Sequence, residues 1–421
     1  MIAPEPRGVE RSRVLRVVFG STFLVRFAFG ITISVFASYI SGSSSGIDQS
    51  AVSTVGLIGA MAPVGEFSTV LLTGGLADRR GRFPVLLGAI GSAALLMLFV
   101  SITRNAWALG GLNLLFGVSS GAILTTSLAL VGDEAAVGSR GFEMGRFDAM
   151  NLLGWVLGFA VGFGLLGALP NRSLGVLFDL GAAVLAGGFG YASLALRRVP
   201  EPVVGRRPLP VADLVRVAFR REVLLVTLPW LVIYLLLGTL FVFLGSASTG
   251  VGVSATVLAL LIGGGGLLLL LTQPYFGRLA DRYGRTRLMT VGAAGFVGVL
   301  AGAGLIATYG PRYYLLGFVA VSALAALAYG PAALAALADL SRTMSRATTM
   351  SIYTLSISLG MFGGLLFSTA LYGRYGAAGL DVYFAAIAGF LVVLTVIRYR
   401  DLARRGATGP DGPGELTSPV R

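Results

Sequence analysis

The chain has 421 residues and a formal net charge of +13; 55% of the residues are hydrophobic, 12% are charged, and the mean hydropathy is +0.84. Soluble domains carry about 25% charged residues, so this composition indicates a membrane protein, and arginines clustered between apolar runs argue against a nucleic-acid partner. All basic residues are Arg, and the absence of Lys, His and Cys excludes P-loop ATPases, pyridoxal-phosphate enzymes and Cys/His sites for zinc, haem or iron–sulfur clusters, so we expect no enzyme, no cofactor and no metal.

Hydropathy predicts twelve membrane-spanning helices and therefore an all-α membrane protein. Each predicted span has the ~20 residues that an α-helix needs to cross ~30 Å of hydrocarbon. In chain order the spans are 15–40, 50–76, 84–102, 107–131, 147–169, 174–196, 222–245, 254–277, 287–308, 312–337, 347–371 and 380–398.

The arginines orient the predicted helices. An even number of spans places both termini on one side. A cytoplasmic N-terminus puts every arginine in a cytoplasmic segment or at the cytoplasmic end of a span, except Arg26, deep within a span, and Arg104, Arg172, Arg312 and Arg374, outside. The opposite orientation would invert this ratio, against the positive-inside rule. We therefore expect a multi-pass protein of the plasma membrane with both termini in the cytoplasm.

The spans predict two six-helix bundles. A cytoplasmic arm, 1–14, leads into the first bundle, 15–196, as a start-transfer helix, and the second bundle covers 222–398. Between the bundles, 197–221 is Pro-rich and then amphipathic and basic, which predicts a cytoplasmic linker on the anionic inner leaflet. The Gly/Pro-rich tail, 399–421, is predicted to be disordered.

An internal repeat relates the two halves. GGLADRRGR at 74–82 recurs as GRLADRYGR at 277–285, an offset of 203 (277 − 74). Parallel six-helix repeats around a site at the membrane midplane are a transporter architecture, and a structural scaffold without transport is the alternative. The predicted fifth and eleventh helices share further matches at an offset of 202 (353 − 151), in which Asn151, Gly154, Gly158 and Gly162 correspond to Tyr353, Ser356, Gly360 and Gly364.

The doubled G-x-x-x-D-R-x-G-R motif resembles the loop signature of the major facilitator superfamily, and the resemblance covers essentially the whole chain. It implies two pseudo-symmetric six-helix bundles and a secondary transporter that works by alternating access around a central cavity. In overall look the chain is nearest to prokaryotic drug and metabolite exporters.

The resemblance also implies a cytoplasmic gate, because in the family the contacts of this motif hold that side shut. Its physical basis is that an Asp at a helix end can accept from the free N–H groups of a neighbouring helix, while the arginines bind C-terminal carbonyls and acidic side chains. Positive-inside topology with a tight Gly turn is the alternative. The implied gate residues are Gly74, Asp78, Arg79, Gly81 and Arg82 in the first half, and Gly277, Asp281, Arg282, Gly284 and Arg285 in the second.

Three ionisable Asp, Glu or Arg residues lie clearly within the predicted spans: Arg26, Glu66 and Asp179. Arg26 and Glu66 are both near the midplane on polar helix faces, so we expect them to face the bundle interior, together with Asn113, which stands where the family often has an embedded Arg. Asp179 is near the outer surface and is interpreted as a hydrated interfacial carboxylate.

Two hypotheses stay open for the central pair. In the first, Glu66 is the proton-coupling carboxyl, whose protonation switches when the site opens to water. In the second, Arg26 and Glu66 form a permanent ion pair that fixes helix packing. At the offset of 203 their counterparts are Pro229 and Leu269, so coupling would belong to the first half.

Aromatic side chains mark the predicted substrate cavity. Aromatic walls with few fixed charges suit apolar or cationic organic molecules, although such residues are also common packing and interface anchors. The candidate cavity residues are Ser34, Trp230, Tyr234, Tyr329 and Tyr353.

We therefore predict a monomeric secondary transporter whose partners are a small-molecule substrate, protons and the lipid bilayer. The favoured activity is proton-coupled efflux of hydrophobic or amphipathic compounds. The alternatives are uptake of a small organic anion with Arg26 as carboxylate clamp and, from another class, a membrane-embedded lipid enzyme or a sensor that does not transport.

Overall fold

The computed structural model describes residues 7–42, 52–135, 139–168, 174–197, 219–250, 271–310, 312–340 and 346–406, together with residues 199 and 216. Apart from short turns, these residues are helical and include no strand, which confirms the predicted all-α class. Nine helices in the described part are long and apolar enough to cross a membrane.

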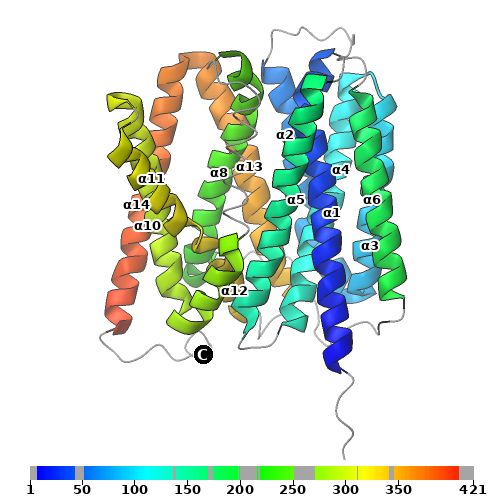
Figure 1. Ribbon diagram of the computed structural model, residues 1–421, viewed down its shortest axis with the longest axis horizontal. Coiled ribbons are helices and arrows are strands. Elements are labelled where there is room, and N and C mark those ends of the chain that lie inside the picture. Colours follow the sequence, from blue (N-terminus) through cyan, green and yellow to red (C-terminus); the bar gives the residue numbers. More distant parts are fainter. Residues whose placement is uncertain are drawn as a thin grey trace, which may run out of the picture.

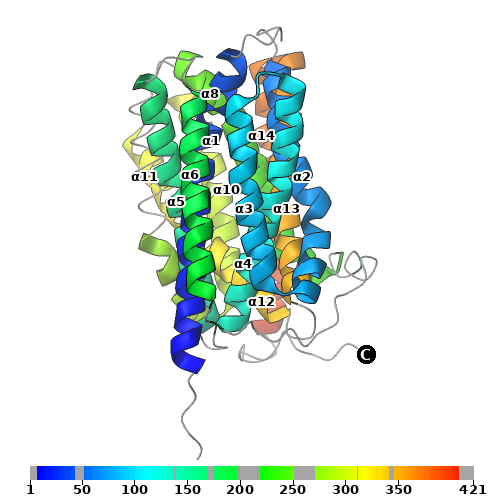
Figure 2. The ribbon, with the colours of Figure 1, turned by 90° about the vertical axis from the view of Figure 1, so that its right-hand side faces the viewer.

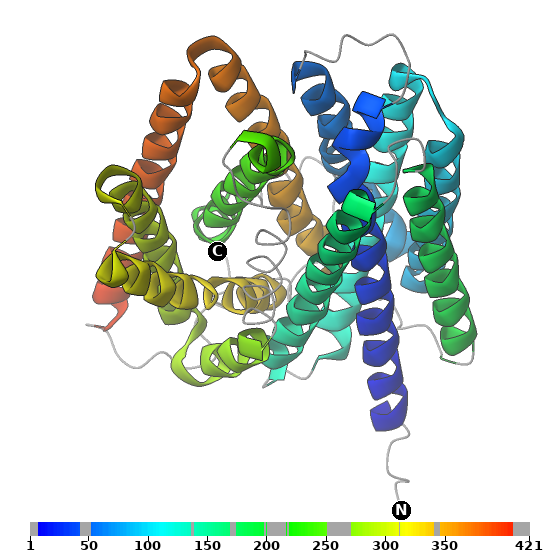
Figure 3. The same cartoon turned by 45° about the horizontal axis from the view of Figure 1, so that its top comes forward.

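The helices stand side by side and form two groups (Figures 1 and 2). Figure 3 shows α1–α6 in one group and α8 with α10–α14 in the other, and the helical segment 271–283 lies between α8 and α10 in the chain. The first turn of α1 and the last turn of α14 lie at the same end of the bundle (Figure 1). The bounds are α1 Arg7–Gly42, α2 Val52–Arg80, α3 Arg82–Ile102, α4 Ala106–Glu134, α5 Arg140–Ala168, α6 Gly175–Leu196, α8 Arg221–Gly250, α10 Arg285–Tyr309, α11 Tyr313–Ala326, α12 Tyr329–Leu340, α13 Arg346–Tyr375 and α14 Ala377–Gly406.

The candidate spans Ser12–Phe36, Tyr313–Asp339 and Ala378–Asp401 agree with the predicted spans to within a few residues, but the helices themselves have other bounds. Helix α1 already begins at Arg7, and α14 continues to Gly406 instead of ending at 398, because hydropathy marks only the apolar part of a helix that extends past it. The predicted span 312–337 is divided into α11 and α12. The linker 197–221 is almost entirely outside the described residues, as are 254–270 of the eighth predicted span and the tail beyond 406.

Matching helix pairs in the two groups pack through glycines. A Cβ added at Gly30 of α1 would lie 2.9 Å from the Gly158 Cα of α5, and one added at Gly360 of α13 would lie 2.7 Å from the Tyr234 Cβ of α8. Such contacts require a residue without a side chain. The offset from α5 to α13 is 202 (360 − 158), as the sequence predicts, so both pairs follow one packing plan.

The first helices of the two halves are related by a different offset. Gly30 and Tyr234 occupy equivalent contacts, which gives 204 (234 − 30) between α1 and α8. Arg26 therefore corresponds to Trp230 (230 − 26) and not to Pro229, as the offset of 203 predicted. The cation of the first half is replaced by an aromatic side chain in the second.

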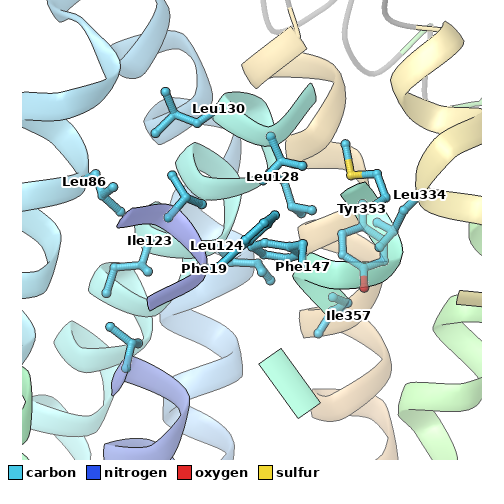
Figure 4. Close-up of a cluster of buried hydrophobic side chains, with 14 of the residues drawn as sticks. Phe19, Leu86, Ile123, Leu124, Leu128, Leu130, Phe147, Leu334, Tyr353 and Ile357 are labelled. Atoms are coloured by element: carbon cyan, nitrogen blue, oxygen red, sulfur yellow. The ribbon is translucent and has the colours of Figure 1, made fainter. Parts of the chain in front are cut away.

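The main apolar core joins the two groups of helices. Figure 4 shows Phe19, Leu124 and Phe147 of the first group beside Leu334 and Tyr353 of the second. All five side chains are at least nine-tenths buried. The two halves therefore meet mainly through buried apolar surface.

Two prolines are inside described helices, Pro63 of α2 and Pro229 of α8, and each leaves a backbone carbonyl without its usual donor. Pro63 of α2 has no N–H for the carbonyl of Gly59, four residues earlier. The Asn113 side chain of α4 donates to the Ile58 carbonyl at 2.9 Å and to the Gly59 carbonyl at 3.4 Å. A side chain thus replaces the missing backbone donor, as hydrocarbon surroundings require.

The same arrangement recurs in α8. Pro229 frees the carbonyl of Leu225, which accepts from the Arg398 guanidinium of α14. Arg398 is buried, so this bond places a cation inside the second half. The hydropathy analysis assigned Arg398 to the end of the last span and missed this role.

Pro331 divides the tenth predicted span. It cannot donate to Leu327, and the chain forms a turn at 327–328 between α11 and α12. The Leu327 carbonyl accepts from the side-chain amide of Gln273 at 3.4 Å. This bond orients Gln273 from the segment 271–283, next to the site described below.

Candidate substrate and gate sites

Arg26 lies at the centre of the first half and is held on two sides. Its side chain is 7% exposed, and Nε donates to the Oδ1 of Asn151 in α5 at 2.8 Å. Its guanidinium carbon is 5.6 Å from the ring centroids of both Phe29 and Trp155. A buried guanidinium needs such partners, because charge in a membrane interior is costly.

Glu66 of α2 faces both groups of helices. Its carboxylate is near enough to interact with the hydroxyls of Ser120 in α4 and Ser358 in α13. Arg26 is near enough to interact with it electrostatically, but no direct ion pair within 4 Å joins the two among the residues that the structure describes. The hypothesis of a direct structural pair is therefore corrected: Arg26 is fixed by Asn151, and Glu66 bridges the halves.

The predicted aromatic residues form one cluster around Trp230. Its ring centroid is 5.2 Å from that of Tyr353, 5.7 Å from Tyr234 and 5.8 Å from Tyr329. The hydroxyls of Tyr234 and Tyr353 lie near each other, and both are close enough to Arg26 for electrostatic interaction. The structure thus brings Trp230, Tyr234 and Tyr353 of the second half together with Arg26 of the first half.

Three predicted site residues make structural contacts. Tyr329 is 0% exposed, and its hydroxyl donates to the Val226 carbonyl at 2.8 Å, so it anchors α12 to α8. Ser34 donates to the Ile31 carbonyl at 2.7 Å on the face of α1 that packs on α5. Asn113 serves the carbonyls at Pro63. Each of these polar atoms has a backbone partner and contributes to helix packing, and the predicted cavity and coupling roles stay predictions.

A buried acid that the sequence analysis missed lies beside the aromatic cluster. Asp148 of α5 is 5% exposed. A Cβ added at Gly330 of α12 would lie 2.8 Å from its Oδ2, 3.5 Å from the Gln273 Oε1 and 3.5 Å from the Trp230 Cη2. Asp148 was overlooked because it is only one residue inside the span predicted at 147–169. Its spacing of three residues from Asn151, on one helix face, was the available signal.

The gate arginines make the same contacts in both halves. Arg82, at the start of α3, forms an ion pair with Asp133 and donates to the Ala129 carbonyl of α4 at 3.1 Å. In the second half, Arg285 of α10 forms an ion pair with Asp339 and donates to the Ala335 carbonyl of α12 at 2.7 Å. The repeated motif therefore makes equivalent contacts in the two halves, between α3 and α4 and between α10 and α12.

Asp281 joins the halves at the same end of the molecule. Its Oδ2 accepts from the backbone N–H of Phe142 at 3.2 Å, in the first turn of α5, where helix N–H groups lack intrahelical partners. Arg285 Nη2 lies 3.6 Å from Oδ1 of the same carboxylate. The surroundings of Gly74 and the side chain of Asp78 are outside the described part, so the matching contact of the first half is not described.

The remaining motif residues have simpler positions. Gly81 and Gly284 have φ of 96° and 92°, which explains glycine at both turns. Arg79 and Arg282 are exposed, and the Arg282 guanidinium carbon lies 5.3 Å from the ring centroid of Tyr283. Gly277 is buried within the segment 271–283.

A cavity of about 390 Å³ lies between α1, α5 and the segment 271–283. None of the predicted cavity residues lines it. Its lining residues are Arg16, Phe19, Gly20, Arg146, Ala149, Met150 and Pro274.

The sequence profile of the Major Facilitator Superfamily matches this chain twice, at residues 18–251 and 231–420. The chain belongs to the major facilitator superfamily. The two matches cover most of the chain, in agreement with the doubled motif and the equivalent packing of the halves. As a member of this superfamily the protein is a multi-pass membrane transporter and not an enzyme.

Curated relatives in bacteria include proteins named multidrug resistance protein MdtG. The chain is 27% identical to that of Salmonella arizonae over 223 residues, 52% of this chain and 54% of the relative. It is 24% identical to that of Serratia proteamaculans over 294 residues, 68% of this chain and 70% of the relative. For the Salmonella relative, the chain thus spans about half of the length.

Two solved structures share the fold. The human organic anion transporter MFSD10 (TETRAN) superposes with a TM-score of 0.73 at 20% identity and covers 94% of this chain and 100% of its own. The proton:xylose symporter XylE superposes with a TM-score of 0.72 at 14% identity and covers 94% and 96%. At these identities the likeness concerns the fold.

Proposed function

We propose that this major facilitator protein exports hydrophobic or amphipathic compounds across the plasma membrane in exchange for protons. The observation that carries the proposal is the position of Glu66 in α2, which packs on both α4 and α13, so that its carboxylate lies near Ser120 of one half and Ser358 of the other. A group held by both halves changes its surroundings when the halves move apart. The likeness to proteins named for multidrug resistance supports efflux.

The proposed exchange follows from these contacts. When the halves separate around Glu66, the carboxyl loses Ser358 and gains water, so that it can take up or release a proton. Arg26 keeps its bond to Asn151 within the first half and limits how strongly the carboxylate holds the proton. The exchange of substrate for proton then requires only that the same separation of the halves exposes both the substrate site and Glu66.

The proposed orientation has both termini and the motif loops in the cytoplasm, following the arginine distribution. The proposed active form is a monomer, because both halves of the repeat are present in one chain. In this orientation the contact of Asp281 with α5 closes the cytoplasmic side.

The experiment is transport in proteoliposomes with an imposed pH gradient, with a lipophilic fluorescent dye as substrate. We expect Glu66→Gln to lose acceleration by the gradient but to retain exchange of dye between the two sides, because a neutral side chain cannot release a proton. Asp179→Asn, which changes an exposed acid of α6, is the matched control and should behave as wild type.

Unchanged dependence on the gradient in Glu66→Gln would reject the coupling role. Accumulation of a small organic anion in place of dye extrusion would favour the uptake alternative, in which Arg26 binds the carboxylate.

A further inference from the structure

The coupling proposal leaves one buried acid unused. Asp148 is 5% exposed, and within the described part of the chain its carboxylate has neither an ion pair nor a hydrogen bond. An ionised carboxylate without a partner is costly inside a membrane protein, even on the most permissive scales. Acidic residues inside membrane spans commonly mark substrate or ion pathways.

Its surroundings provide a second acceptor. Gln273 is 3% exposed, and its amide nitrogen is bound to the Leu327 carbonyl that Pro331 leaves free, so its Oε1 is directed elsewhere and has no donor. Both this oxygen and the Asp148 Oδ2 border the same point above Gly330, where no side chain intervenes. Two buried oxygen acceptors therefore converge with nothing to donate to them.

The third component of the site is aromatic. The Trp230 ring reaches the same point above Gly330 and packs edge-on against Tyr353, while its Nε1 has no acceptor. Aromatic faces next to a carboxylate attract cations through both charge and the ring quadrupole. The site combines one negative charge, a neutral oxygen and aromatic surface.

We propose that Asp148 is a binding site for the protonated amine of a lipophilic organic cation. The ammonium N–H groups donate to the Asp148 carboxylate and to the Gln273 Oε1, and the apolar body of the ligand lies against Trp230 and Tyr353. This pairing removes the cost of the buried charge and satisfies the unused acceptor. The inference rests on the proposed export function in one respect: if the protein exports such compounds, these amines are among them.

The position of the site links binding to movement. Asp148 belongs to α5 of the first half, whereas Gln273, Trp230 and Gly330 belong to the second. In this structure these groups are packed against each other, so the ligand enters when the two halves separate. A ligand that needs this space favours the arrangement in which the two halves have moved apart.

The test is equilibrium binding to purified full-length protein in detergent, without any proton gradient. The probes are 3,3-diphenylpropylamine and its neutral counterpart 3,3-diphenylpropanol, which share their apolar body and differ in charge. We expect the wild type to bind the amine at least tenfold more tightly than the alcohol. Asp148→Asn should lose this preference while its affinity for the alcohol stays unchanged, and Asp179→Asn should bind both probes as wild type does.

A second variant covers the case in which Asp148→Asn does not fold. Gly330→Ala keeps the charge and places a methyl group where the ligand nitrogen would lie, so amine affinity should fall several-fold with a smaller effect on the alcohol. Wild-type protein that binds both probes equally, or binds neither, overturns the proposal. So does an Asp148→Asn protein that keeps the preference for the amine, since Asp148 would then hold a proton only.

The outcome is independent of the coupling experiment. Loss of amine preference in Asp148→Asn supports this site even if vesicles show no proton-driven transport. Glu66→Gln should keep amine binding in detergent, because Glu66 does not border Gly330.

Discussion

Asn113 illustrates how a single side chain in a membrane protein can be structural although its position looks functional. Its amide donates to the carbonyls of Ile58 and Gly59, one of which lost its backbone donor to Pro63. Arg398 and Gln273 do the same at Pro229 and Pro331. In hydrocarbon a carbonyl without a backbone donor cannot hydrogen-bond to water, so a side chain from a neighbouring helix must donate to it.

Replacing Asn113 by Ala should therefore lower the free energy of unfolding by about 1 kcal/mol, the usual size of an interhelical hydrogen bond in a membrane protein. The measurement is unfolding in mixed micelles of detergent and SDS. A double-mutant cycle supplies the control: Pro63→Ala restores an N–H four residues after Gly59, so the loss of Asn113 should cost less in that background. Equal losses in both backgrounds would separate Asn113 from the proline.

Asp148 and Asn151 show the limits of reading single residues. Both lie on one face of α5, and only Asn151 was singled out, through its place in the repeat. Hydropathy sums over a window of about 20 residues and treats a charge near the edge of a span as interfacial. The burial of Asp148 results from Gly330 and Gln273, whose positions are 182 (330 − 148) and 125 (273 − 148) residues away.

At the scale of elements, glycines decide how the helices pair. Gly30 meets Gly158 between α1 and α5, and Gly360 meets Tyr234 between α8 and α13. Without a hydrophobic driving force between helices in lipid, close backbone approach provides much of the association energy. The equivalent pairs in the two halves explain why the glycine pattern survives as a repeat.

Gly158→Ala should destabilise the protein by about 1–3 kcal/mol, because its Cβ would lie 2.8 Å from the Gly30 Cα and force α1 away from α5. Gly164→Ala on the same helix is the matched control, since a Cβ there meets nothing within 4 Å. Thermal unfolding of the two variants tests the difference. Similar unfolding temperatures would show that the α1–α5 contact tolerates a side chain.

At the scale of the whole molecule, two hydrogen bonds and one aromatic contact connect the two groups of helices at different levels. Asp281 accepts from the N-terminus of α5, Thr125 and Thr354 share a hydrogen bond of 3.1 Å between α4 and α13, and the Phe67 and Phe362 ring centroids of α2 and α13 are 5.9 Å apart. Asp281 is the charged member of this set and the one that the repeated motif predicts.

Asp281→Asn should weaken the contact with α5 and increase the opening of this end of the molecule. The native sequence has no cysteine, so Ala149→Cys, a buried position beside the cavity between α1, α5 and 271–283, gives a single reporter. We expect thiol labelling of this reporter to become several-fold faster in the Asp281→Asn background. The exposed acid Asp381 of α14 provides the control, because Asp381→Asn should leave the rate unchanged. A rate that does not respond to Asp281→Asn would contradict a gate at this contact.

The amino-acid sequence alone determined the all-α membrane class, most of the helices, the repeat and the superfamily, because hydropathy, charge distribution and short motifs are properties of contiguous residues. Tertiary structure alone decided which polar groups meet. Asn113 and Ile58 are 55 positions apart, Arg398 and Leu225 are 173 apart, and Arg26 and Asn151 are 125 apart. A buried polar group is stable only beside its partner, and in this transporter that partner comes from another helix, brought near by the packing of glycines and apolar side chains.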